Sequence, residues 1–154
     1  MAETATSEEL MRTALVQARA ALAAGEVPVG AVVMLNGRVV GEGFNQPITS
    51  GDPTAHAEIV ALRAAARAVG NYRLTGATLC VTVEPCAMCV GAMVHARIGA
   101  LIYGAAEPKT GAIESTMELL AHPSWNHRFM AEGGVLAEDC RRLIQDFFRD
   151  RRGK

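Results

Sequence analysis

The sequence predicts an α/β layered domain with a mixed β-sheet, because strand and helix patterns alternate along the chain after an opening hairpin. Residues 29–35 and 39–44 are rich in β-branched and apolar side chains. They flank Asn36-Gly37, the strongest short signal for a hairpin turn. We therefore expect these two segments to pair antiparallel. Later strands are expected at residues 77–83, 100–103 and 133–136.

Helices are expected before and between these strands. Thr6 followed by Glu9 forms a capping box, after which apolar residues recur at helical spacing. An alanine-rich helix is expected over residues 54–69, with His56 in its first turn. The remaining helices are expected at residues 85–95, 113–120 and 137–152.

Composition predicts a cytoplasmic protein that folds as one domain over residues 1–154. Half of the residues are hydrophobic, so the chain can bury a substantial core. The N-terminal segment is acidic and lacks the basic region of a secretory signal, and no apolar stretch is long enough to cross a membrane. Cysteines in a chain of this kind indicate a metal site or a reactive thiol more than a disulfide framework.

The candidate metal ligands are His56, Cys86 and Cys89. A catalytic zinc site takes three protein ligands and leaves the fourth tetrahedral position to water. A Cys-x-x-Cys pair on a helix places both sulfurs on one face, and a helix N-terminus favours the thiolate. Because His56 begins a different helix, we expect the site to form where two helix N-termini meet beside the sheet. Cys80 and Cys140 lack ligand-like spacing and are expected to be buried apolar residues.

Glu58 is the candidate catalytic residue. Two positions along a helix correspond to about 200°, so we expect Glu58 to reach the bound water from the side. There it can take a proton from zinc-activated water and deliver protons to a ring nitrogen and a departing amine, as hydrolytic deamination requires. A Cys-x-x-Cys pair alone is often structural or redox-active, but His-x-Glu followed by Pro-Cys-x-x-Cys is the signature of zinc deaminases.

Segments along nearly the whole chain carry a wider resemblance. They are Glu26-Val-Pro-Val-Gly-Ala-Val-Val, Gly41-Glu-Gly-Phe-Asn-Gln-Pro, Asp52-Pro-Thr-Ala-His-Ala-Glu-Ile, Asn71-Tyr-Arg-Leu, the run from Glu84 to Ile98, Pro108-Lys-Thr-Gly-Ala, Asn126-His-Arg and Asp146-Phe-Phe-Arg. With the metal motif, these segments resemble the bacterial tRNA-specific adenosine deaminases of the cytidine-deaminase-like superfamily. Departures are Ser124-Trp125, where the family often has Gly and Met, and Phe44, where tryptophan is frequent.

The resemblance implies a three-layer α/β/α cytidine-deaminase-like domain with a mixed sheet of about five strands. It implies a homodimer that binds one Zn²⁺ per subunit and converts the wobble adenosine of an arginine tRNA anticodon to inosine. It matches the zinc ligands to His56, Cys86 and Cys89 and the proton shuttle to Glu58. Asn45 matches the residue that contacts the flipped nucleoside, and Val29 and Met88 match walls of the base pocket. Contacts to the anticodon stem-loop are implied at Lys109, Asn126, Phe147 and Arg149.

The charge distribution favours an RNA partner in this context, although the formal net charge is −1. Cations gather at the C-terminus, at Arg141, Arg142, Arg149, Arg151, Arg152 and Lys154. Taken alone, such a run is often only a solvated helix end. A helix that presents Phe147 and Phe148 beside these arginines offers base stacking and phosphate contacts. Leu143 and Ile144 are expected in the core, and Phe148 is a further candidate for it.

Two other functions remain open from the residues. One is a deaminase of a free base or nucleoside, such as guanine or cytosine, which uses the same zinc site without an RNA-binding tail. The other is a non-catalytic, zinc-stabilised binding module. Glu84, which precedes the metal motif, is expected either to orient the site or to cap a helix.

Overall fold

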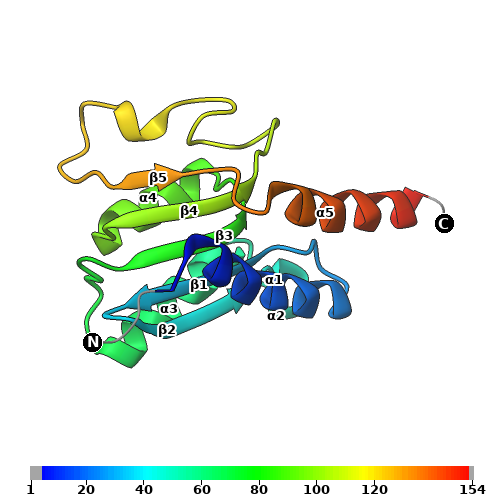
Figure 1. Cartoon of the computed structure of the whole chain (residues 1–154), viewed down its shortest axis with the longest axis horizontal. Helices are drawn as coiled ribbons and strands as arrows, with labels where there is room; N and C mark the ends of the chain where they lie inside the picture. Colours follow the sequence, from blue (N-terminus) through cyan, green and yellow to red (C-terminus); the bar gives the residue numbers. More distant parts are fainter. Residues whose placement is uncertain (1–4, 153–154) are drawn as a thin grey trace.

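A computed structural model describes residues 5–152 and shows a five-stranded mixed sheet (Figure 1). The strands are β1 (Gly30–Leu35), β2 (Arg38–Phe44), β3 (Thr78–Val83), β4 (Ala100–Ala105) and β5 (Met130–Glu132). Their order is β2-β1-β3-β4-β5. The strand β1 is antiparallel to β2 and β3, whereas β4 is parallel to β3 and β5. The helices are α1 (Ser7–Ala23), α2 (Pro47–Ser50), α3 (Ala57–Val69), α4 (Ala87–Ala96), the 3-10 helix η1 (Leu119–Ala121) and α5 (Ala137–Arg152).

The predicted opening hairpin is confirmed. Asn36 and Gly37 have φ angles of 52° and 77°, as a two-residue turn with the twist of the flanking strands requires. Leu35 pairs with Arg38 directly across this turn. Local chemistry therefore sets the register of the first two strands.

Helices cover both faces of the sheet, as the three-layer prediction requires (Figure 1). On one face, α1 and α5 bury a cluster that includes Met11, Val32 and Cys140. On the other face, α3 and α4 bury a larger cluster around Leu79 and Met93. The predicted α/β/α architecture is therefore confirmed.

Two glycines let α3 lie directly against β2. A Cβ at Gly41 would lie 2.4 Å from the carbonyl oxygen of Ala61, and a Cβ at Gly43 would lie 2.6 Å from the amide nitrogen of Ala61. Only glycine permits so close an approach of two backbones. Because β2 ends just before Asn45, this packing holds the start of α3 beside the end of the hairpin.

Two predicted elements in the second half of the chain are wrong. Residues 113–120 do not form a helix, and only η1 is helical there, because the backbone amides of Thr116 and Leu119 donate to the carbonyls of Gly111 and Ala112 and not to those four residues earlier. The last strand is β5 rather than residues 133–136, where positive φ angles at Gly134 and Leu136 turn the chain.

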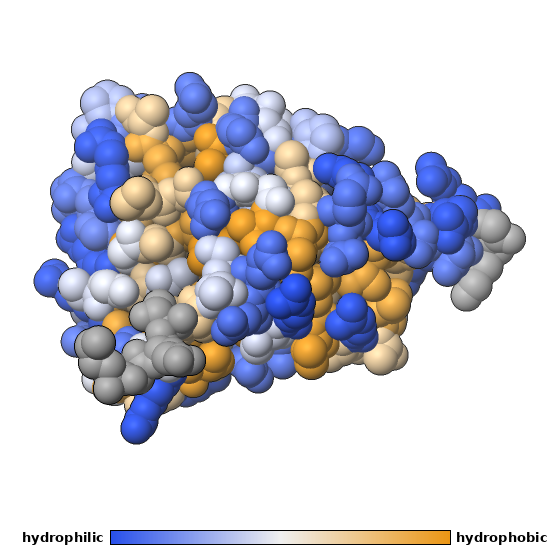
Figure 2. Space-filling model, viewed as in Figure 1, coloured by the Kyte–Doolittle hydropathy of each residue, from blue (hydrophilic) through white to orange (hydrophobic). Residues whose placement is uncertain are grey.

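The helix α5 extends beyond the sheet, and hydrophilic side chains gather around its free end (Figure 1 and Figure 2). The predicted cation Lys154 lies outside the described residues. Cys80 and Cys140 are buried free thiols, as the sequence predicts. Within residues 5–152, none of the helices combines the length and the apolar character that a membrane span needs.

Candidate active site

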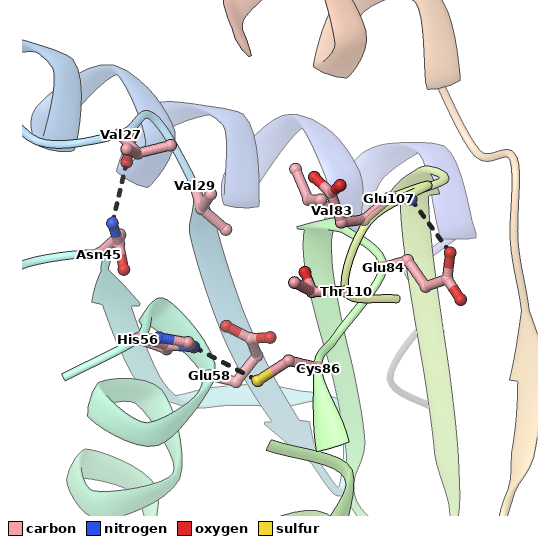
Figure 3. Close-up of a pocket in the computed structure, with 10 residues that line it drawn as sticks. All are labelled: Val27, Val29, Asn45, His56, Glu58, Val83, Glu84, Cys86, Glu107 and Thr110. Carbon is pink, nitrogen blue, oxygen red and sulfur yellow. Dashed lines mark hydrogen bonds between the residues drawn. The ribbon is translucent and has the colours of Figure 1, made fainter. Parts of the chain in front are cut away.

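A cavity of about 210 Å³ opens at the end of the sheet where β1 begins and where β2 and β3 end (Figure 3). The N-termini of α3 and α4 form its floor, and the segment that follows β4 forms one side. Its lining residues are Val27, Val29, Asn45, His56, Glu58, Val83, Glu84, Cys86, Glu107 and Thr110.

His56, Cys86 and Cys89 form a group that could hold a metal ion. Their ligand atoms all lie within 4.8 Å of one another. The Nδ1 atom of His56 lies 3.6 Å from Sγ of Cys86 and 3.5 Å from Sγ of Cys89. A tetrahedral ion with usual Zn–N and Zn–S bond lengths would place nitrogen and sulfur about 3.6 Å apart. The donor set and its spacing therefore fit zinc.

Both helices of this group begin later than the sequence predicts. His56 is the N-cap of α3 and Cys86 is the N-cap of α4, each with an extended backbone. Cys89 is at the third helical position of α4, which is where an N-cap side chain normally binds. The two sulfurs therefore meet at the N-terminus of α4, one from its cap residue and one from its first turn.

The thiols and the imidazole share their protons unequally. A hydrogen bond from the Cys89 thiol, against the opposing effect of burial and with help from His56, lowers the pKa of Cys86 to about 4. The same bond, together with burial, raises the pKa of Cys89. The Cys86 side chain raises the pKa of His56. The site therefore stabilises an anionic sulfur on Cys86, and a metal cation can displace the remaining protons.

Glu58 is buried at the floor of the cavity, next to His56 and Cys86 (Figure 3). The predicted rotation of about 200° between His56 and Glu58 does not apply, because His56 precedes the helix and has a ψ angle of 154°. Both side chains therefore reach the same cavity. Burial raises the pKa of Glu58 to about 7, although the charge on His56 opposes this effect. A carboxyl group with such a pKa can both accept and donate a proton near neutral pH.

The predicted pocket residues are partly brought together. Val29 and Asn45 line the cavity, and the amide nitrogen of Asn45 donates to the Val29 carbonyl at 3.0 Å. The Asn45 side chain donates from Nδ2 to the Val27 carbonyl at 3.4 Å, which fixes the orientation of its amide. Met88 is 38% exposed on the first turn of α4 and is not among the residues that line the cavity.

Four lining residues were missed by sequence reasoning, namely Val27, Val83, Glu107 and Thr110. Thr110 lies inside the Pro108–Gly111 segment that carries the family resemblance, so the sequence could have indicated it as a site residue. Val83 ends β3, and the end of a strand before the metal motif is a further signal. Glu107 carries no signal in the sequence, because its place depends on the fold of a loop.

Glu84 holds that loop and does not cap a helix. Its carboxylate accepts backbone amides from Glu107, Ile113, Glu114 and Ser115, and the hydroxyl of Ser115. Burial by itself raises the pKa of Glu84, but the donors on Glu114, Ser115 and Glu107 outweigh it and hold this pKa below its usual value. The side chain is therefore an ionised structural anchor at the edge of the cavity.

The residues with implied RNA contacts lie outside the cavity. Lys109 is exposed and lines a hollow with Phe148 and Arg152 of α5. Asn126 accepts a hydrogen bond from Arg97 at 3.4 Å, on another part of the surface.

The aromatic pair on α5 differs from the expectation that both rings are presented. Phe147 is 8% exposed, and the Arg151 guanidinium covers its ring with 4.6 Å between Cζ and the ring centroid. Phe148 is 44% exposed. Arg149 forms an ion pair with Asp146 at 2.8 Å. The ring available for stacking is therefore that of Phe148.

The chain also matches the family model of the MafB19-like deaminases over residues 5–152. The chain belongs to this family. The tRNA-specific adenosine deaminases of Haemophilus influenzae and Bacillus subtilis are 49% and 41% identical to this deaminase over 146 and 150 residues. These alignments cover 94% and 97% of the chain, and 84% and 93% of the two relatives.

A solved structure of similar fold comes from a study of A-to-I editing by tRNA:A34 deaminases at the wobble position of transfer RNA. It superimposes on this deaminase with a TM-score of 0.85 and 43% sequence identity. The match covers 87% of the chain and 97% of the solved chain. Together with the curated relatives, it confirms the family that the sequence resemblance predicts.

Removal of one ligand should release the metal from this deaminase. We expect the wild-type protein to purify with about one metal ion per chain, and Cys86→Ala to lose it, because two ligands cannot enclose an ion. Elemental analysis of dialysed protein measures this content. Cys140→Ala, which removes a buried thiol on α5, is the matched control and should keep the metal. Full occupancy in Cys86→Ala would contradict the ligand assignment.

Proposed function

We propose that this deaminase is a zinc-dependent enzyme that hydrolyses the wobble adenosine of a tRNA anticodon, that of an arginine tRNA, to inosine. The observation that carries the proposal is the meeting of a His-Cys-Cys group with a buried Glu58 in one cavity. The family and the names of the relatives support adenosine in tRNA as the substrate. A substrate of this kind also supports a cytoplasmic location.

The reaction adds water to C6 of adenine and releases ammonia. When bound by His56, Cys86 and Cys89, zinc supplies a positive charge that lowers the pKa of a water molecule. Glu58 can take the proton of that water and deliver protons to the N1 atom of the ring and to the departing amino group. Its burial, which raises its pKa to about 7, suits a group that must exchange protons in both directions.

Binding of the base is assigned to the upper part of the cavity. Val29 provides an apolar wall, and the held amide of Asn45 offers polar atoms to the nucleoside (Figure 3). Anticodon-loop bases are already unpaired, so extrusion of one base into such a cavity costs little.

Recognition of RNA is assigned to α5 and the loop beside it. Lys109, Phe148 and Arg152 border one hollow next to the cavity wall, so a cation and an exposed ring meet there. Such a surface suits phosphates and unstacked bases. A deaminase of free guanine or cytosine has no use for it, which is why we favour the tRNA substrate. A non-catalytic module would not need a buried carboxyl group such as Glu58 beside the metal group.

A homodimer is proposed through α3 and α4. Their outer surface forms an apolar hollow of about 320 Å³, bordered by Ile59, Ala66, Tyr72, Leu74 and Ala92 among others. Tyr72 is largely exposed there. A hollow with apolar walls between two adjacent helices, beside the exposed Tyr72, suits a partner with the same surface.

Incubation of the purified protein with total transfer RNA should produce inosine at the wobble position, detected by sequencing. Glu58→Gln should lower the rate about 10²- to 10⁴-fold, because it removes a general acid and base while the metal ligands remain. Elemental analysis should find the same zinc content in both proteins. An inactive wild-type protein would refute the enzyme. Full activity of Glu58→Gln would refute the shuttle.

Loss of the exposed cations of α5 should weaken RNA binding alone. We expect the double variant Arg149→Ala, Arg152→Ala to raise KM for an anticodon stem-loop and to flatten its dependence on salt, since each lost phosphate contact lowers the slope. The control double variant is Arg12→Ala, Arg38→Ala, which removes the same charge elsewhere on the surface. A KM equal to the wild-type value would contradict the assignment of RNA contacts to α5.

A charge placed between α3 and α4 should separate the proposed dimer. Light scattering should give the wild-type protein twice its chain mass of 16.3 kDa. Ala92→Glu should give the monomer mass, because a carboxylate would be buried in the apolar interface. Val16→Glu, on the exposed side of α1, is the control and should remain dimeric. A monomeric wild-type protein would overturn this part of the proposal.

A further inference from the structure

The segment of residues 106–116 forms one wall of the cavity without being a helix or a strand. Glu107 and Thr110 from this segment line the cavity opposite Val29 and Asn45 (Figure 3). A wall of irregular backbone keeps one shape only where hydrogen bonds hold it. The contacts of this segment therefore decide the shape of the substrate-facing side.

The Glu84 side chain, which is 3% exposed, accepts hydrogen bonds from both ends of the segment. Its Oε1 atom accepts the amide of Glu107 at 3.0 Å and the hydroxyl of Ser115. Its Oε2 atom accepts the amides of Ile113, Glu114 and Ser115 at 3.1, 2.8 and 3.0 Å. One carboxylate thus joins the beginning of the wall to its end.

Gly111 makes this closure possible. A Cβ at position 111 would lie 2.4 Å from both Cδ and Oε1 of Glu84, and 2.6 Å from the carbonyl oxygen of Glu107. The amide of Gly111 donates to that carbonyl at 2.9 Å, and the amide of Ala112 donates to the Pro85 carbonyl at 2.8 Å. Only a residue without a side chain lets the segment wrap so closely around the carboxylate.

We propose that Glu84 is a positioning residue for deamination, whose carboxylate fixes residues 106–116 as a preformed wall for the substrate, with Gly111 as the contact that permits it. The inference rests on the proposed function, since substrate binding is one of its readouts. Among the described residues, Glu84 forms no hydrogen bond with the metal group or with Glu58. A preformed wall lowers the ordering cost of binding, so its loss should appear in KM.

The variant Glu84→Gln keeps the size of the side chain but turns one acceptor oxygen into an NH₂ donor. One end of the segment must then lose its partner, because NH₂ cannot accept a backbone amide. We expect KM for an anticodon stem-loop to rise about ten-fold, while kcat changes less than about three-fold. Amide hydrogen exchange in residues 107–115 should become faster, and zinc content should not change.

Gly111→Ala tests the same contact from the other side and leaves the carboxylate intact. It should raise KM by a similar factor. The double variant Glu84→Gln, Gly111→Ala should not exceed the larger single effect by more than about two-fold, because both changes displace one segment. Glu118→Gln, an exposed site later in the same loop, is the charge-matched control and should keep the wild-type KM.

The measurements separate this inference from the proposed function. Wild-type KM in both Glu84→Gln and Gly111→Ala would overturn it. Loss of zinc from Glu84→Gln, with a fall in kcat and an unchanged KM, would place Glu84 in the metal site and would also overturn it. If the wild-type protein deaminates no tRNA, the proposed function fails, whereas unchanged hydrogen exchange in Glu84→Gln would refute the anchoring role itself. If Glu84→Gln does not fold, the KM of Gly111→Ala decides.

Discussion

The candidate site depends on one constraint, which is that the N-caps of α3 and α4 lie side by side. The nitrogen of His56 and the sulfur of Cys86 are 3.6 Å apart, although thirty residues separate them in the chain. Gly41 and Gly43 allow α3 to pack closely against β2. Only two residues separate the end of the strand β3 from Cys86, which places the start of α4 beside the same end of the sheet. Helix N-termini present unpaired amides and the positive end of the helix dipole. Their meeting therefore creates a place where thiolates are stable before any substrate binds.

Buried carboxylates that bind backbone amides also hold the segments around the cavity. Glu26, which is 1% exposed, accepts the amides of Ile48 at 3.4 Å and Thr49 at 2.6 Å, just after Asn45. Glu84 does the same on the opposite side for residues 106–116. In both cases burial by itself raises the pKa of the carboxyl group, but the backbone amides and hydroxyls outweigh it, so the pKa is lowered. The walls are thus held by ionised carboxylates whose charge is stabilised by backbone amides and hydroxyls.

Features set by neighbouring residues could be predicted from the sequence, and features set by distant contacts could not. The hairpin follows from Asn36-Gly37, and the metal group follows from residue types at fixed spacings. The expected helix over residues 113–120 does not form, because the amides of Thr116 and Leu119 donate to Gly111 and Ala112 within a loop that the distant Glu84 carboxylate holds. The burial of Phe147 could also be predicted from the sequence. Phe147 lies seven residues, or two helical turns, after Cys140, which is buried, so both lie on the same face of α5.

The same distinction explains why the metal motif alone left the substrate open. The proton-transfer chemistry needs only the starts of α3 and α4 and the burial that raises the pKa of Glu58 to about 7. In the proposed function, the substrate meets a different set of parts, namely Asn45, residues 106–116 and the exposed face of α5. Residues 106–116 are held by Glu84, which is not a member of the metal group, so their shape can change while the floor stays the same. On this proposal, substrate choice depends on how the walls are held, and the proposed metal ligands do not encode it.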